Sequence, residues 1–326
     1  MNSFLLDRNL ALEAVRVTEI AAIASSFHMG RGDEKAADQA AVNAMRDFLN
    51  ELDVCGKVVI GEGERDKAPM LYIGEKVGRG DVNVDIALDP LEGTTITAQG
   101  GENALSVLAI GEEGSFLHAP DIYMKKIAYG YKYEDLEINI DDEPKKIIND
   151  FSKFSHIREE NIVVCILNRP RHEELIKQVR STGARIKLIP DGDVSAVIAT
   201  SIDNSGIDLY MGIGGSPEGV LAAAALRCLG GKIYSKLIYD NDATFERAKK
   251  MGVSDKNKVF QTNDLAQGDV MFSATGVTDG TLLRGVRIKN NEAHTQSVVM
   301  RSKTDTVRYI SAKHNLNIKK YRSYFK

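Results

Sequence analysis

The chain has 326 residues, of which 43% are apolar and 27% are charged, and this balance is typical of folded globular proteins rather than disordered or fibrous ones. Its 42 basic and 46 acidic residues give a net charge of -4, so the overall charge favours neither nucleic acid nor an anionic membrane as a partner. No apolar run approaches the roughly 18 residues of a membrane span and the N-terminus lacks signal-peptide features, so we expect a cytoplasmic protein.

The first half is predicted to begin with helices and continue with strands. Apolar residues recur at helical spacing over about residues 8–28 and again over 38–52, which indicates two helices. Residues 57–61 and 82–88 are β-branched or alternate apolar with polar, which predicts two strands, each followed by carboxylates. Residues 103–111 and 115–129 suggest a strand, a turn and an extended segment that form an antiparallel pair.

The second half has a different pattern. Residues 131–160 are polar and weakly periodic, so we expect a boundary near residue 150, between an α+β half (1–150) that binds metal and an α/β half (151–326) that carries substrate-binding loops, with an active site shared by the two. Strands and helices then alternate, which predicts a largely parallel sheet covered by helices. The expected strands are 161–168, 185–189 and 206–213, and the expected helices are 171–182, 193–201 and 217–229.

Carboxylates cluster after the two early strands. Residues 61–66 (GEGERD) place three carboxylates and two glycines beyond the first strand, although a solvated turn with Asp66 as a helix cap explains them equally well. Residues 89–95 (DPLEGTT) place two carboxylates three residues apart, followed by a glycine and two hydroxyls. Oxygen ligands of this kind suit a hard cation and its phosphate ligand, whereas the alternative is an acidic turn stabilised by its own side chains.

Residues 212–219 (GIGGSPEG) combine four glycines with a carboxylate before a helix of small residues. Pro217 and Glu218 are favoured at a helix start without any ligand, but the same segment could hold a phosphate while Glu218 reaches a metal. Pro217 stands where the third glycine of a dinucleotide-binding motif belongs, and no P-loop motif occurs. Nucleotide-binding interpretations therefore fail.

Two further segments lie at predicted strand ends, where α/β sheets bind ligands. Residues 169–172 (RPRH) follow one strand and offer arginine forks for phosphate, and residues 191–193 (DGD) follow the next and offer carboxylates for sugar hydroxyls. A helix opened by Pro170 and caps from Asp191 or Asp193 are equally good explanations of each piece alone.

Taken together, these motifs resemble bacterial class II fructose-1,6-bisphosphatase over nearly the whole chain. The resemblance also includes residues 30–33 (GRGD), 68–76 (APMLYIGEK) and 119–124 (APDIYM). More distantly, DPLEGT is similar to the D-P-[IL]-D-G-T signature of lithium-sensitive, Mg-dependent phosphatases. The resemblance implies a layered α/β/α/β/α sandwich, a role in gluconeogenesis and a homo-oligomer.

The resemblance also implies roles for individual residues. Mg²⁺ or Mn²⁺ would be bound by Asp38, Glu62, Asp89, Glu92 and Glu218. Asp66 and Thr94 would orient and activate the attacking water. The sugar bisphosphate would contact Glu92, Gly93, Thr94, Tyr123, Arg169, Pro170, Arg171, Asp191, Gly192, Asp193 and Gly215. Many relatives carry lysine directly after the GxGD segment, whereas this chain has Glu34 there, so Lys35 is a candidate phosphate contact.

The resulting hypothesis is hydrolysis of the 1-phosphate of fructose 1,6-bisphosphate by a metal-activated water, without a phosphoenzyme intermediate. Within the enzyme class, the alternatives are a phosphatase that also accepts sedoheptulose 1,7-bisphosphate and one that acts on inositol phosphates. A sugar-phosphate sensor without turnover is the alternative outside it. The full acidic set together with Thr94 and Asp66 argues against a sensor, because binding an anion does not require those groups.

Overall fold

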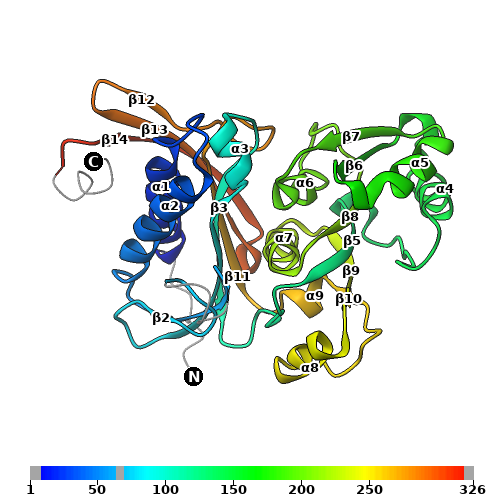
Figure 1. Cartoon of the computed structure of the whole chain (residues 1–326), viewed down its shortest axis with the longest axis horizontal. Helices are drawn as coiled ribbons and strands as arrows, with labels where there is room; N and C mark the ends of the chain where they lie inside the picture. The colour runs from blue at the N-terminus through cyan, green and yellow to red at the C-terminus, as the bar shows by residue number, and fades with distance from the viewer. Residues whose placement is uncertain (1–8, 64–69, 319–326) are drawn as a thin grey trace. The chain divides into compact units, whose positions relative to one another are not determined.

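The computed structural model describes residues 9–63 and 70–318 (Figure 1). The chain divides into two compact units, unit 1 (Met1–Phe116 and Gly268–Lys326) and unit 2 (Leu117–Gln267). This division differs from the boundary expected near residue 150, which falls inside helix α4 (Pro144–Ser155) of unit 2. The physical reason is that the C-terminal strands return to the sheet of the N-terminal segment, where they complete unit 1.

Unit 1 is built on an eight-stranded mixed sheet with the order β12-β13-β11-β4-β3-β1-β2, to which β14 adds by pairing with β13. β1 and β3 are parallel, and the other neighbours are antiparallel. The strands are β1 (Cys55–Ile60), β2 (Lys76–Val77), β3 (Asn83–Glu92), β4 (Leu105–Glu112), β11 (Val270–Gly276), β12 (Arg287–Lys289), β13 (Glu292–Arg301) and β14 (Thr306–Asn315), and the helices are α1 (Leu10–Ser26), α2 (Glu34–Leu49) and α3 (Thr94–Gln99), with a 3₁₀ turn η4 (Ser302–Thr304).

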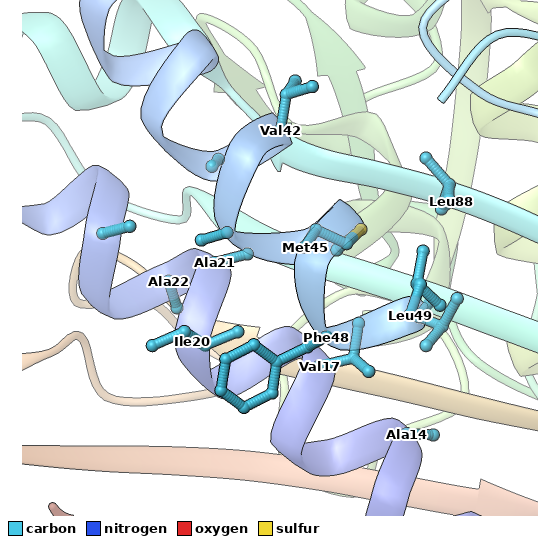
Figure 2. Close-up of a cluster of buried hydrophobic side chains, with 14 of the residues drawn as sticks. Ala14, Val17, Ile20, Ala21, Ala22, Val42, Met45, Phe48, Leu49 and Leu88 are labelled. Atoms are coloured by element: carbon cyan, nitrogen blue, oxygen red, sulfur yellow. The ribbon is translucent and has the colours of Figure 1, made fainter. Parts of the chain in front are cut away.

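The core of unit 1 lies where α1 and α2 pack together over the sheet (Figure 2). Both predicted N-terminal helices are confirmed, and α2 begins earlier than expected because the Asp33 side chain accepts a hydrogen bond from the Ala36 N–H and caps it. Small residues such as Ala21 and Ala22 allow the helices to approach closely, while Met45 and Leu88 fill the space below them. Truncating Met45 to alanine would cost about 2–5 kcal/mol.

Unit 2 is built on a six-stranded mixed sheet with the order β10-β9-β5-β8-β6-β7. α4 and α5 cover one face of this sheet and α6 and α7 cover the other (Figure 1). The strands are β5 (Tyr123–Tyr129), β6 (Val163–Leu167), β7 (Arg185–Ile189), β8 (Leu209–Gly215), β9 (Lys232–Leu237) and β10 (Phe260–Gln261). The helices are α4 (Pro144–Ser155), α5 (Glu173–Ser181), α6 (Asp193–Ala199), α7 (Ser216–Leu229), α8 (Asp242–Lys250) and α9 (Thr262–Leu265), with 3₁₀ turns η1 (Tyr131–Tyr133), η2 (Glu159–Asn161) and η3 (Pro170–His172).

The predicted α/β class is confirmed, with two corrections. The predicted pairing of 103–111 with 115–129 is wrong, because β4 pairs with β3 and β11 in unit 1 whereas β5 pairs with β8 and β9 in unit 2. The second sheet is only partly parallel, since β7, β6 and β8 run together and β5, β9 and β10 add antiparallel pairs.

The structure also bears on membrane association and on the state of the cysteines. None of the described helices is long and apolar enough to cross a bilayer. The three cysteines are free thiols; Cys165 and Cys228 are buried and Cys55 is partly exposed.

Candidate active site

Two of the predicted carboxylates lie near the ends of neighbouring parallel strands in unit 1, Glu62 just beyond β1 and Asp89 within the last part of β3. β1 and β3 pair with Ile60 opposite Ala87, and Glu62 and Asp89 each come two residues beyond that pair. Parallel strands end at the same edge of a sheet, which is where α/β proteins bind ligands. The register therefore brings both residues to the same end of the two strands.

A third carboxylate reaches Glu62 from helix α2. Burial raises the pKa of Asp38 above its ordinary value. Burial, and then the negative charge of Asp38, raise the pKa of Glu62 to about 8. Two carboxylates that repel each other in a partly buried place form a site that a cation would stabilise.

The DPLE segment forms a β-bulge. The register between β3 and β4 shifts between Asp89 and Glu92, and the Leu91 N–H donates to Asp89 Oδ1 over 3.0 Å. Gly93 then takes the left-handed conformation (φ 96°) and starts α3 at Thr94. Such bulges reorient side chains at strand ends. The segment is thus an internally stabilised acidic turn that also presents the buried Glu92 carboxylate and the half-buried Thr94.

The described residues of unit 1 bring together only part of the predicted metal-binding set. Within residues 9–63 and 70–318, no three His, Cys, Asp or Glu side chains are arranged closely enough to hold a metal ion. Asp38 and Glu62 interact through their charges, while Glu218 belongs to unit 2. The predicted catalytic Asp66 lies outside the described residues. Lys35 is exposed in the first turn of α2.

In unit 2 the predicted substrate residues share one edge of the sheet. β7, β6 and β8 run in parallel, so the segments at 169–171, 191–193 and 215 follow strands that end on the same side. β5 is antiparallel to β8 with Tyr123 opposite Gly215, so Tyr123 begins its strand at that edge. Three predicted segments and Tyr123 therefore lie at the same end of this sheet.

Arg171 is held in a defined position at this edge. Its Nε and Nη2 atoms donate to the Ile213 carbonyl over 3.0 and 2.9 Å, and its guanidinium lies 4.7 Å from the centre of the Tyr123 ring. Both side chains are exposed, so the remaining N–H donors of Arg171 can reach an anion. Arg169 makes a weaker contact, with its Nη2 3.7 Å from Asp191 Oδ1.

The neighbouring His172 is a structural support rather than a ligand. Its Nδ1 donates to the Leu167 carbonyl over 2.7 Å, and its Nε2 accepts from the Ile213 N–H over 2.8 Å. Burial lowers the pKa of His172, in agreement with a neutral ring that carries its proton on Nδ1. The ring therefore joins the end of β6 to β8, next to the carbonyl that holds Arg171.

Asp193 is buried in an ion pair that the sequence did not predict. Lys126 Nζ lies 2.6 Å from Asp193 Oδ2, and both side chains are almost fully buried, with exposed fractions of 1% and 6%. Lys126 also donates to the Gly215 carbonyl over 2.9 Å, and the Tyr210 hydroxyl donates to Asp193 Oδ2 over 3.2 Å. A side chain at Gly214 would overlap Asp193 Oδ2 and Lys126 Nζ, so this glycine leaves room for the pair.

Glu218 lies beside an open cavity of about 460 Å³ in unit 2. Burial, and then the charge of Asp193, raise the pKa of Glu218 to about 7, while Lys126 opposes this shift. Glu218 Oε2 is enclosed and has no hydrogen-bond partner within the described residues, and a Cβ atom at Gly215 would overlap it. The cavity is lined by Asp121, Ile122, Tyr123, Gly215, Glu218, Asp240, Thr244 and Arg247.

Comparison with known proteins agrees with this chemistry. The model of the family described as bacterial fructose-1,6-bisphosphatase, glpX-encoded, matches residues 8–314. The chain belongs to this family. It is 44% identical to a D-fructose 1,6-bisphosphatase class 2/sedoheptulose 1,7-bisphosphatase of Synechococcus sp. (strain JA-3-3Ab), over 95% of this chain and 96% of the relative. A protein of the same description from Synechocystis sp. is 43% identical, over 95% and 97% of the two chains.

Membership of this fructose-bisphosphatase family confirms the resemblance and the predicted enzyme class, a phosphoric monoester hydrolase. The family is metal-dependent, and the residues present fit a hard divalent cation. Asp38 and Glu62 offer oxygen donors whose mutual repulsion a cation would relieve, and Glu218 Oε2 is a buried acceptor without a partner within the described residues.

No role was predicted from the sequence for Lys126, Asp240 or Arg247, and His172 appeared only as the last residue of the 169–172 segment. Lys126 carried a local signal, because it alternates with Met124 and Ala128 on a buried strand face where a charge needs a partner. Arg247 Nη2 donates to the Asp121 carbonyl from α8 over 3.1 Å, and no local pattern in α8 announces this contact.

Proposed function

We propose that the chain hydrolyses the 1-phosphate of fructose 1,6-bisphosphate to give fructose 6-phosphate, with Mg²⁺ or Mn²⁺ as cofactor. The observation that carries the proposal is the mutually repelling pair Asp38 and Glu62 at the strand edge that also bears the DPLEGT bulge. An oxygen-only set beside a hydroxyl suits phosphoryl transfer to water. Membership of the fructose-bisphosphatase family supports the choice of substrate.

The proposed metal ligands are all carboxylates: Asp38, Glu62, Asp89 and Glu92 in unit 1, and Glu218 in unit 2. A divalent cation held by carboxylate oxygens would neutralise charge on the phosphoryl group and lower the pKa of a bound water. The residues themselves supply the negative charge that selects the cation. Because all donors are oxygen, Mg²⁺ and Mn²⁺ are both suitable.

Thr94 and Asp66 are proposed to orient and activate the attacking water. Thr94 is the first residue of α3, directly after the left-handed Gly93, so its hydroxyl is set by the turn that follows the two DPLE carboxylates. Water as the nucleophile requires no covalent phosphoenzyme. Lys35, exposed at the start of α2, is a candidate contact for a phosphate oxygen.

Substrate binding is assigned mainly to unit 2. Arg171, stacked on Tyr123 and clamped by the Ile213 carbonyl, would bind a phosphate through its free N–H groups. Asp193 would contact the sugar through Oδ1, since Lys126 and Tyr210 both bind Oδ2. The remaining proposed contacts are Glu92, Gly93, Thr94, Arg169, Pro170, Asp191, Gly192 and Gly215.

Three wider predictions remain part of this proposal. They are the arrangement of the layers as an α/β/α/β/α sandwich, assembly into a homo-oligomer, and location in the cytoplasm. Size-exclusion chromatography with light scattering tests the second, and a monomer at micromolar concentration would contradict it.

A second substrate, sedoheptulose 1,7-bisphosphate, is favoured by the names of the relatives, which are described as dual bisphosphatases. We propose that this chain also hydrolyses it. Side-by-side assays with sedoheptulose 1,7-bisphosphate, fructose 1,6-bisphosphate and an inositol phosphate would decide, and turnover of the inositol phosphate alone would reject both sugar substrates.

The test of the proposed function is metal-dependent release of phosphate from fructose 1,6-bisphosphate. We expect activity in the wild type that chelation removes, and a loss of about 100-fold or more in the turnover of Thr94→Ala and Asp66→Ala. Thr95→Ala, the adjacent hydroxyl, is the matched control and should keep most activity. Undiminished turnover in both Thr94→Ala and Asp66→Ala would reject their assigned roles, and tight bisphosphate binding without hydrolysis would favour a sensor.

A further inference from the structure

A second hollow lies towards the edge of the unit 1 sheet that is formed by β12, β13 and β14. None of the predicted site residues lines it. It has a volume of about 620 Å³ and is formed by the 279–287 segment together with β13 and β14. Two strands, β11 and β4, separate β13 from β3 and its acidic bulge. Its side chains include Asp279, Arg284, Arg287, His294, Gln296 and Ser311.

Three basic residues stand in a row across the strands at this hollow. Arg287 on β12 pairs with His294 on β13, and His294 pairs with Lys313 on β14. Directly opposed residues in antiparallel strands project from the same face of the sheet, and all three are exposed. Arg287 and Lys313 therefore bring two positive charges to one face of the sheet, on either side of the His294 ring, and negative charge that offsets them would be favourable.

The chain supplies part of that negative charge. Lys313 Nζ lies 2.8 Å from Glu292. Asp279 accepts hydrogen bonds from the Gly285 N–H and from Arg287, and these bonds, with the nearby charge of Arg284, lower the pKa of Asp279. Residues 279–316 nevertheless contain seven Arg and Lys against three Asp and Glu, in a chain with a net charge of -4. Positive charge is therefore concentrated here and only partly compensated.

The donors that remain line the hollow. The backbone N–H of Arg284 donates to Gln296 Oε1 over 2.7 Å, which fixes the backbone of the loop. The Arg284 guanidinium makes no hydrogen bond or ion pair with the residues described. Arg287 uses one nitrogen for Asp279 and retains other N–H groups. Together with the His294 ring and the Ser311 hydroxyl, these groups form a donor-rich surface with one carboxylate, already engaged by Arg287.

We propose that this hollow binds a small anion that carries a phosphate group, either inorganic phosphate or a phosphate monoester. Arginine forks bind phosphate oxygens through paired hydrogen bonds, and the volume is within the range of small-molecule sites. A bound dianion would offset the positive charges of Arg284 and Arg287, which line the hollow. The site lies on β-strands that contribute none of the proposed catalytic residues, so it is independent of the proposed function.

Equilibrium dialysis of the full chain against inorganic phosphate at low ionic strength tests the proposal. Arg284→Gln should weaken phosphate binding to the hollow about tenfold or more, and Arg308→Gln, an exposed arginine on β14 that does not line the hollow, should not. The measurement is repeated in an Arg171→Gln background, where binding at the proposed active site is impaired and binding at the hollow should persist. Unfolding curves without phosphate show that each variant is folded, and His294→Gln serves as the second variant.

The outcomes separate the alternatives. Equal phosphate affinity in the wild type and in Arg284→Gln would overturn the proposal, as would an equal loss in Arg308→Gln, which would indicate a diffuse surface charge. Disappearance of all phosphate binding in Arg171→Gln would also overturn it. Retention in Arg171→Gln with loss on adding Arg284→Gln would support it, whatever the catalytic activity proves to be.

Discussion

The buried ion pair of Lys126 and Asp193 gives the sharpest test of the physical reasoning. Replacing Lys126 by methionine keeps an unbranched side chain of nearly the same length and removes the charged ammonium group. Asp193 then loses its 2.6 Å partner while its side chain remains 94% buried, and the Gly215 carbonyl loses the hydrogen bond from Lys126 Nζ.

The structure sets the expected magnitude. Removing one partner of a buried ion pair costs about 3–5 kcal/mol of unfolding free energy, mainly because a charge is left without compensation. The Tyr210 hydroxyl still donates to Asp193, so we expect the lower end, about 3 kcal/mol. The matched control is Lys132→Met, because Lys132 and Asp203 form a pair at 2.5 Å whose side chains are 57% and 62% exposed. Little change is expected there, since exposed pairs contribute little to stability.

Urea unfolding of the metal-free chain measures both variants. Adding Asp193→Asn to Lys126→Met should recover part of the loss, because the second change removes the uncompensated charge. Lys126→Met should also lose turnover, since Gly215 and Asp193 belong to the proposed substrate site. A loss in Lys126→Met no larger than in Lys132→Met, or a double variant less stable than the sum of its parts, would refute the reasoning.

Three further predictions follow from the site. Burial and Asp38 raise the folded pKa of Glu62 to about 8 from 4.5, so the folded chain holds a proton that the unfolded chain releases. The unfolding free energy of the metal-free chain should therefore fall by roughly 3 kcal/mol as pH rises from about 5 to about 8. Thermal unfolding in chelator, repeated across this pH range, should show a weaker pH dependence for Glu62→Gln than for the wild type. An equal pH dependence in the two proteins would contradict the assignment. Arg171→Lys keeps the charge but loses the two bonds to the Ile213 carbonyl, so KM should rise about tenfold with a normal melting temperature, whereas an unchanged KM would remove Arg171 from the substrate site. Gly215→Ala places a methyl group against Glu218 Oε2, so metal affinity, measured by calorimetric titration, should fall about tenfold or more; unaltered affinity would exclude Glu218 as a ligand.

Strand ends were predictable from the sequence because their signals are local. The alternation before Asp89 and the apolar run before Glu62 predict strands, and parallel pairing of β1 and β3 then brings the two carboxylates to one edge. Gly192 and Pro217 likewise mark the starts of α6 and α7, since one adopts a left-handed turn and the other fits a first helical turn.

Long-range pairing was not predictable in the same way. The turn at 112–114 looks like a hairpin, yet β4 joins β11 from the C-terminal part of the chain, and β5 enters another sheet. No local pattern distinguishes a strand that pairs with its neighbour from one that pairs with a segment far along the chain. The partner of Lys126 was hidden for the same reason, because Asp193 lies 67 residues away.

The protein compensates the negative charge of some buried carboxylates and not of others. Within each unit, this difference distinguishes structural carboxylates from candidate metal ligands. In unit 2, Asp193 is buried beside Lys126 and Tyr210, so its charge is compensated by the protein itself. In unit 1, Asp38 raises the pKa of Glu62 instead of lowering it, so that pair depends on a proton or a cation. Glu218 is intermediate, since Lys126 lowers its pKa and Asp193 raises it. A carboxylate that the fold leaves uncompensated is one that a metal can stabilise. On this criterion Glu62 should respond most strongly to removal of the metal, Glu218 less, and Asp193 not at all.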